Sequence, residues 1–237
     1  MTTATAVRCG GEAFLIDSPY LPDELEALPA LMGQSGFEPT GLLATHADFD
    51  HLLARLAFQG LPLGVGESTA LRLRAEPGVA QRQLRDADTE HYVRRPEPLS
   101  LGSVQSLPVP GKLDIGDSEL ELHPAEGHTT DGTAFFWRKT GLLICGDYLS
   151  DVEIPAVTSL ADYRSTLERL DRLVHDAETI VPGHGSPHDR ESAQRILEQD
   201  IAYLDVLEGG SERVRLPAGR DSERQRQLHR ENLARLQ

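Results

Sequence analysis

The chain has 237 residues, 39% hydrophobic and 26% charged, which is typical of a globular protein large enough to bury a core. Its 38 acidic and 23 basic residues give a formal net charge of −15, and so acidic a surface argues against a general nucleic-acid binder. Two cysteines exclude a disulfide framework, and no apolar run approaches the ~18 residues that span a bilayer, so we expect a cytoplasmic protein with no membrane partner.

The first part of the chain alternates short apolar strands with helices. A Gly10-Gly11 pair between two apolar runs predicts a β-hairpin. From His51 onward, apolar residues recur at helical spacing. The expected strands are 3–9, 12–17, 40–45 and 61–66, and the expected helices are 21–36, a short one after His51, and 67–75.

Residues 75–100 are polar, poor in core residues and end in prolines. The pattern is compatible with a solvated, partly helical loop, or with a lid that helps to recognise a substrate. Arginines are frequent here for so acidic a protein, at Arg72 and Arg74 just before the segment and at Arg82, Arg85, Arg94 and Arg95 within it.

The second part of the chain is rich in strands and then in helices. Ser159 and Asp162 form an S-x-x-D capping pattern before an amphipathic run. We expect a single domain, 1–237, of the α/β class, in which helices cover the sheets. The expected strands are 112–116, 118–128, 132–138, 141–147 and 179–185, and the expected helices are 159–174, 189–208 and a C-terminal surface helix within 211–237.

Histidines and aspartates recur where apolar strands end. Strand ends gather at one edge of a sheet, so residues far apart in the sequence can converge there. Imidazole and carboxylate groups on rigid elements are the ligands of protein metal sites. The residues that share this context are His46, Asp48, Asp50, His51, His123, His128, Asp147 and His184.

Four of these stretches, "THADFDH", "GHT", "GD" and "PGHG", resemble in order and spacing the metal-binding motifs of the metallo-β-lactamase fold hydrolases. The resemblance covers about residues 5–205. It implies a four-layer αββα sandwich of two mixed sheets flanked by helices, with a one- or two-metal site in the groove between the sheets. In "FLIDSP", Asp17 resembles the residue that supports the metal-binding loop.

The resemblance also implies a ligand set and two divalent metal ions, with zinc expected. Asp50 would also shuttle a proton to the leaving group. One metal position would take His46, Asp48 and His128, the other Asp50, His51 and His184, and Asp147 would bridge them.

This chain departs from the family's H-x-H-x-D-H motif at Asp48, which stands where the family has a histidine. Three interpretations are open. Asp48 is a ligand that shifts the preference toward iron or manganese, or it is too short to reach and one ion binds, or the site is degenerate and the protein is a non-catalytic relative.

The function that the resemblance implies is hydrolysis of a small-molecule ester, thioester, lactone or phosphoester by a metal-bound hydroxide. The alternative is a non-haem iron oxidoreductase of the same fold, which the acid at position 48 favours. The sequence does not name the substrate, and it leaves the oligomeric state open.

Overall fold

The structure, a computed structural model, describes residues 2–211 and 214–236. The chain divides into two units, residues 1–122 and 123–237. Its strands form two five-stranded mixed sheets. None of the described helices combines the length and apolar character needed to cross a membrane.

The first sheet belongs to the first unit and has the strand order β1-β2-β3-β4-β5. The predicted hairpin is present, with Cys9 paired to Glu12 across the turn, and the remaining neighbours pair in parallel. The edge strand β5 was not predicted, because its sequence VQSL is polar and half-exposed and so lacks a core signal. The strands are β1 (Ala4–Cys9), β2 (Glu12–Asp17), β3 (Gly41–Ala44), β4 (Leu63–Gly66) and β5 (Val104–Leu107).

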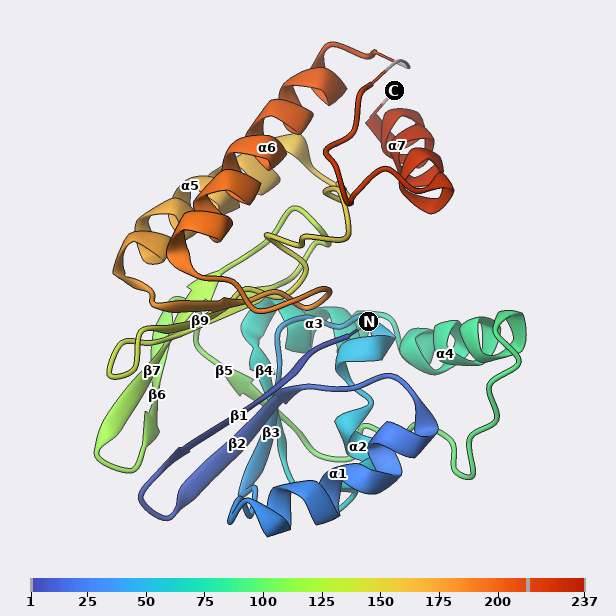
Figure 1. The fold of residues 1–237 in the computed structure, drawn as a ribbon. Coiled ribbons are helices and arrows are strands. Elements are labelled where there is room, and N and C mark those ends of the chain that lie inside the picture. Colours follow the sequence, from blue (N-terminus) through green and yellow to red (C-terminus); the bar gives the residue numbers. More distant parts are fainter. Residues whose placement is uncertain (1, 212–213, 237) are drawn as a thin grey trace. The chain divides into compact units, whose positions relative to one another are not determined.

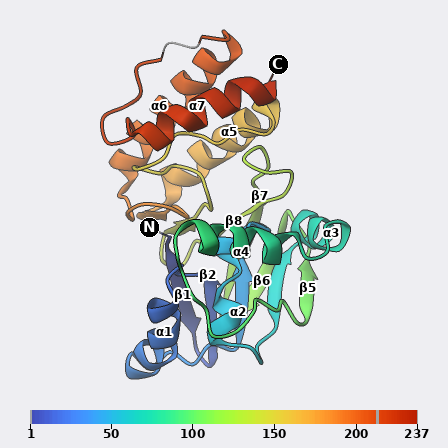
Figure 2. The same ribbon diagram turned by 90° about the vertical axis from the view of Figure 1, so that its right-hand side faces the viewer.

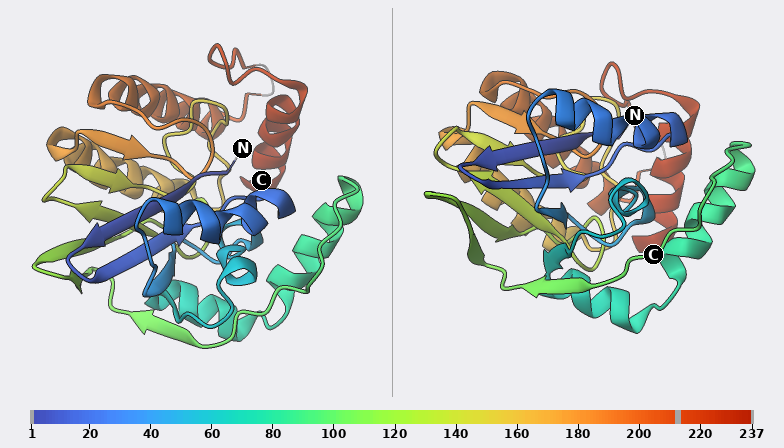
Figure 3. Two further views of the ribbon diagram at one scale, coloured as in Figure 1. Left: turned by 60° about the horizontal axis from the view of Figure 1, so that its bottom comes forward. Right: turned by 90° about the horizontal axis from the view of Figure 1, so that it is seen from below.

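The helices of the first unit share an apolar core with this sheet. Figures 1 and 3 show α1 and α2 lying beside it. Leu42, Leu53 and Leu63 are almost fully buried in the shared core. These elements are α1 (Pro22–Gln34), the 3₁₀ helix η1 (Phe49–His51), α2 (Ala54–Ala57), α3 (Glu67–Ala75) and α4 (Val79–Glu90).

The polar segment 75–100 contains α4, which lies at the periphery of the first unit (Figure 3). Arg95 attaches the segment to the unit. Its side chain is 5% exposed, its Nε lies 2.8 Å from Asp88 Oδ2, its Nη2 donates to the Tyr20 carbonyl and its guanidinium lies over the Tyr20 ring. Arg95 therefore has a structural role, and a lid function for the segment stays a prediction.

The second sheet has the strand order β10-β9-β8-β7-β6. Strands β9 and β10 run parallel, with Ile144 paired to Val181 at their carboxyl ends. Residues that follow these two strands therefore emerge at the same edge. The strands are β6 (Gly111–Ile115), β7 (Ser118–Pro124), β8 (Thr133–Trp137), β9 (Leu142–Ile144) and β10 (Thr179–Val181).

Three helices of the second unit lie together in Figure 2: α5 (Leu160–Asp176), α6 (Arg190–Glu208) and α7 (Glu223–Leu236). The predicted cap of α5 is present, since the Asp162 N–H donates to Ser159 Oγ at 3.3 Å. Helix α7 buries polar side chains as well as Leu233, and its Asn232 is completely buried. The C-terminal helix is therefore packed into the second unit along one face.

Candidate metal centre

The loop after β3 carries the first group of predicted ligands. The strand itself is fully buried, and the chain then turns through Thr45 and His46 into η1, which ends at His51. Both histidines are only 2% exposed. Two buried imidazoles directly after a strand need polar partners, because unsatisfied buried polar groups are costly.

Asp17 organises this loop from the end of the neighbouring strand β2. Its Oδ1 accepts the Thr45 backbone N–H at 2.8 Å, and its Oδ2 accepts the Thr45 hydroxyl at 2.9 Å. The same Oδ2 lies 3.0 Å from Nδ1 of His51. Asp17 adopts a positive φ of 58°, a conformation that Asp and Asn tolerate better than most residues. The supporting role expected for Asp17 thus has a clear geometric basis.

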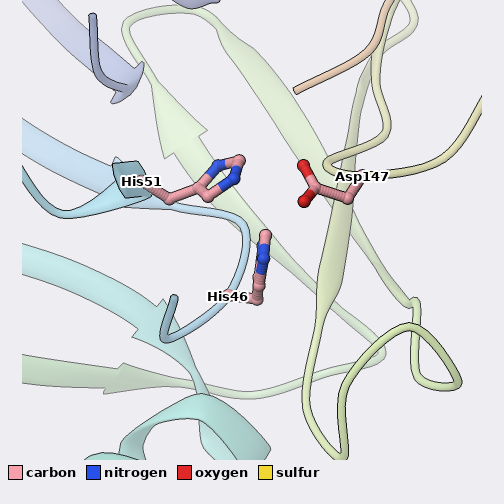
Figure 4. Close-up of side chains that lie close together, drawn as sticks. All are labelled: His46, His51 and Asp147. Carbon is pink, nitrogen blue, oxygen red and sulfur yellow. The ribbon is translucent and has the colours of Figure 1, made fainter. Parts of the chain in front are cut away.

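The two histidine rings of the loop are held side by side, with centroids 4.1 Å apart (Figure 4). Nδ1 of His46 lies 3.0 Å from the Thr45 hydroxyl, and Nδ1 of His51 faces Asp17. The Thr45 hydroxyl donates its proton to Asp17, so its oxygen is left to accept from Nδ1 of His46. An acceptor at Nδ1 fixes the tautomer in which Nε2 carries the lone pair. Both rings are therefore prepared to donate to a metal ion through Nε2.

The two aspartates of the motif lie beside these rings. One Asp48 oxygen is 3.7 Å from Nε2 of His46, and one Asp50 oxygen is 3.9 Å from Nε2 of His51. The first unit therefore brings together all four ligands predicted from its sequence.

The second unit brings together the other three predicted ligands at the edge where its strands end. His128 follows β7, Asp147 follows β9 and His184 follows β10. One oxygen of Asp147 lies 3.2 Å from Nε2 of His128 and 3.3 Å from Nε2 of His184. Figure 4 shows the Asp147 side chain extending from its loop. An oxygen this close to both imidazole nitrogens is suited to bind an ion together with either of them.

Three groups around His128 escaped the sequence analysis. Its Nδ1 lies 3.1 Å from the carbonyl of Ala156, and its backbone N–H donates to the hydroxyl of Tyr148. That hydroxyl in turn donates to the Glu126 carbonyl at 2.7 Å. Burial raises the pKa of Tyr148 far above its usual value, so it stays a protonated phenol. Backbone carbonyls and a tyrosine after a "GD" pair leave no recognisable sequence signal.

Gly127 allows the loop that carries His128 to approach helix α5. Its φ is 118°, and a Cβ at this position would lie 2.2 Å from the backbone nitrogen of Tyr163. Its carbonyl also accepts the N–H of Thr158 at 2.8 Å. A side chain at position 127 would therefore displace His128 or α5.

The sequence profile described as the metallo-beta-lactamase superfamily matches residues 1–184. The chain belongs to the metallo-β-lactamase superfamily. Membership supports a metal-dependent hydrolase in general, and it agrees with a donor set of histidines and aspartates that suits divalent ions. No curated protein sequence matches the chain.

Solved structures share the metallo-β-lactamase fold at low sequence identity. A metallo-beta-lactamase family protein from Thermus thermophilus has a TM-score of 0.64 and 21% identity, over 86% of this chain and 75% of that one. A beta-lactamase domain protein from Burkholderia ambifaria has a TM-score of 0.64 and 19% identity, over 98% and 79%. A protein named TTHA1623, solved in a di-iron-bound form, has a TM-score of 0.61 and 24% identity, over 81% and 92%. The predicted fold class is confirmed.

In this metallo-β-lactamase family member, the aspartate that departs from the usual motif, Asp48, has an ion-pair partner. Nη2 of Arg72, on α3, lies 2.8 Å from Oδ1 of Asp48. The Arg72 side chain is 15% exposed, and its Nε also lies 3.4 Å from Glu76. The aspartate that replaces a histidine therefore has its charge compensated within the first unit. In the sequence, Arg72 is notable only because it stands just before the polar segment 75–100.

Proposed function

We propose that this chain is a hydrolase of a small-molecule ester, thioester, lactone or phosphoester, and that it depends on divalent metal ions. The observation that carries the proposal is the orientation of the histidine rings. His46, His51 and His128 each have an oxygen of the protein within 3.1 Å of Nδ1. Metal-ligating histidines nearly always have such a partner, because it orients the ring and raises its basicity.

The donor set determines which ions fit. Imidazole and carboxylate together suit zinc, iron and manganese, and we propose two ions, with zinc as the first candidate. The proposed ligands are those that the family resemblance implies. One position would use His46, Asp48 and His128, the other Asp50, His51 and His184, and Asp147 would serve both.

When bound, the ions would supply Lewis acidity and a water that loses its proton near neutral pH. The residues of the chain would orient the ligands and move the proton. The Asp50 side chain is 17% exposed while its carboxylate lies beside His51, so a substrate can reach this carboxylate. We propose that Asp50 accepts a proton from the attacking water and delivers it to the leaving group.

The proposed activity is tested by metal reconstitution. The chelator-treated protein is loaded with Zn²⁺, Mn²⁺ or Fe²⁺ and assayed with 4-nitrophenyl esters, a thioester, lactones and a phosphodiester. We expect turnover of at least one class that chelation abolishes and metal restores, and a loss of about 10²-fold or more in Asp50→Asn, since general acid–base catalysis contributes about that much. Turnover without metal, or an unchanged Asp50→Asn, would contradict the proposal.

The second candidate is a non-haem iron oxidoreductase. Asp48 is the residue that favours it, because a carboxylate is a harder ligand than imidazole and shifts the preference from zinc toward iron or manganese. The nearby guanidinium of Arg72 weakens this argument, since it already balances the charge of Asp48. Metal analysis separates the two functions. Iron with dioxygen consumption favours the oxidoreductase, zinc with ester hydrolysis favours the hydrolase, and failure to bind metal at micromolar concentration favours a non-catalytic protein.

Arg72 is expected to weaken the metal position that includes Asp48. Its guanidinium competes with the ion for the same carboxylate and leaves less negative charge for the metal. Replacing Arg72 with methionine should therefore raise the Zn²⁺ affinity of the weaker position about tenfold, which would correspond to about 1.4 kcal/mol. Titration against a chromophoric chelator measures the affinity for each of the two equivalents of Zn²⁺.

Two variants complete this test. Arg74→Met removes the same charge from an exposed position on the same helix and should leave both affinities unchanged within a factor of two. Asp48→His restores the family ligand and should bind two equivalents tightly. If Arg72→Met binds zinc no better than the parent does, the ion pair does not limit the zinc affinity of the position that includes Asp48.

The net charge of −15 supports a small molecule rather than a nucleic acid as substrate. The cytoplasmic location stays a prediction.

A further inference from the structure

The segment between β9 and α5 includes a stretch, residues 153–157, that has no regular secondary structure although much of it is buried. Ile154 and Val157 are at most 3% exposed. Buried backbone N–H and C=O groups outside helices and sheets require other partners. In this segment, those partners come largely from the C-terminal part of the chain.

Side chains on α7 and just before it bind the backbone of this segment almost residue by residue. All of these contributors lie beyond residue 184, where the match to the family profile ends. Arg220 donates to the Glu153 carbonyl (3.2 Å), Gln225 accepts the Ile154 N–H (2.8 Å), and Asn232 both donates to the Pro155 carbonyl (2.7 Å) and accepts the Val157 N–H (2.9 Å).

The residue between the two Asn232 contacts is Ala156, and its carbonyl lies 3.1 Å from Nδ1 of His128. Asn232 is completely buried, so its amide has a fixed position. Its Nδ2 also donates to the hydroxyl of Tyr203, on α6, at 3.0 Å. The backbone on both sides of the Ala156 carbonyl is therefore clamped by one side chain.

We infer that Asn232 is a positioning residue for His128. By holding residues 155 and 157, it fixes the carbonyl that selects the tautomer of His128 and the orientation of its ring. The inference rests on the proposed role of His128 as a metal ligand. The test therefore measures metal affinity and stability separately.

The test compares Asn232→Asp and Asn232→Leu with the parent in Zn²⁺ competition titrations and in the absorption spectrum of the Co²⁺-loaded protein. Asn232→Asp keeps the acceptor for Val157 N–H but replaces the donor to Pro155 with an oxygen. We expect Zn²⁺ affinity for one equivalent to fall about tenfold, which is within the range for groups that orient metal ligands, and the Co²⁺ bands to shift.

Tyr203→Phe is the matched control, because it removes the hydroxyl that bonds both Asn232 and His229 but leaves the contacts to residues 155 and 157 in place. It should lower the free energy of unfolding while leaving Zn²⁺ affinity within a factor of two and the Co²⁺ spectrum unchanged. If Asn232→Leu does not fold, Asn232→Asp decides. Unchanged affinity in the Asn232 variants, or an equal loss in Tyr203→Phe, overturns the inference, whereas a parent protein that binds no metal refutes the proposed function instead.

Discussion

Replacing Asp200 with leucine is expected to lower the free energy of unfolding by about 3–5 kcal/mol, because the change leaves a buried cation without its counter-ion. Asp200 is 1% exposed and Arg220 is 2% exposed, and the two form an ion pair through Nη1 of the arginine. The guanidinium also donates to the Gln199 amide oxygen and the Glu153 carbonyl, and both of these acceptors are neutral. Urea unfolding followed by circular dichroism measures the loss.

The double variant Asp200→Leu, Arg220→Met is the control for this prediction. Replacing both members of a buried pair by apolar residues of similar size is often neutral, so most of the lost stability should return. A single variant that costs under about 1 kcal/mol, or a double variant as unstable as the single one, would contradict an uncompensated charge as the cause.

The pH dependence of Arg220→Met provides a check on the same pair. The pKa of Asp200 is raised from 3.8 to about 6, because burial raises it more than Arg220 lowers it, so removing Arg220 should raise the pKa further. At pH 8 the variant must bury an unpaired carboxylate or take up a proton, whereas near pH 5 the carboxyl group is neutral in both proteins. The stability difference between variant and parent should therefore shrink as the pH falls from 8 to 5.

The second large effect is expected for Asp17→Asn. This change should weaken Zn²⁺ binding at the position that includes His51 by about 100-fold, the largest loss that is typical when a group orienting a metal-ligating histidine is removed. Oδ1 of Asp17 must stay an acceptor for the Thr45 N–H, so the asparagine NH₂ would face Nδ1 of His51. Two donors cannot face each other there. The proton of His51 then moves to Nε2, which removes the lone pair that the metal needs.

This prediction has a direct spectroscopic readout, since the ¹⁵N shifts of the His51 ring distinguish the two tautomers. Asparagine tolerates the positive φ of Asp17, so the backbone should be preserved. Ser18→Ala is the control, because it alters the next buried residue, whose hydroxyl donates to the Pro19 carbonyl. A His51 ring that keeps its proton on Nδ1 in Asp17→Asn, with parental zinc affinity, would show that Asp17 does not act through the tautomer.

The sequence predicted the parts of the fold that have strong local signals. The hairpin turn at Gly10-Gly11 and the cap at Ser159 are each specified by a few adjacent residues, and both are present. Strand β5 was missed because an exposed edge strand has little apolar periodicity. The family resemblance supplied the sheet architecture, which local patterns do not encode.

The candidate metal ligands could be picked out because they stand in recognisable motifs at strand ends, and each unit brings its own candidates together. The contacts that support these residues could not be predicted. The Arg72 contact with Asp48 joins residues 24 positions apart, and the contact of Asn232 with residues 155 and 157 depends on how α7 packs. Such pairs follow from tertiary packing, for which a single sequence carries no periodic signal.

The close approach at Gly127 has a consequence for how these motifs are interpreted and transferred. The glycine of "GHT" touches no ligand atom in the described contacts, but a Cβ there would collide with the first turn of α5. The glycine of the motif is therefore required by the packing of α5 and not by the chemistry of the metal site. Grafting the histidine into another scaffold would transfer the donor without the backbone geometry that delivers it, so a transplanted site needs the glycine and the helix end together.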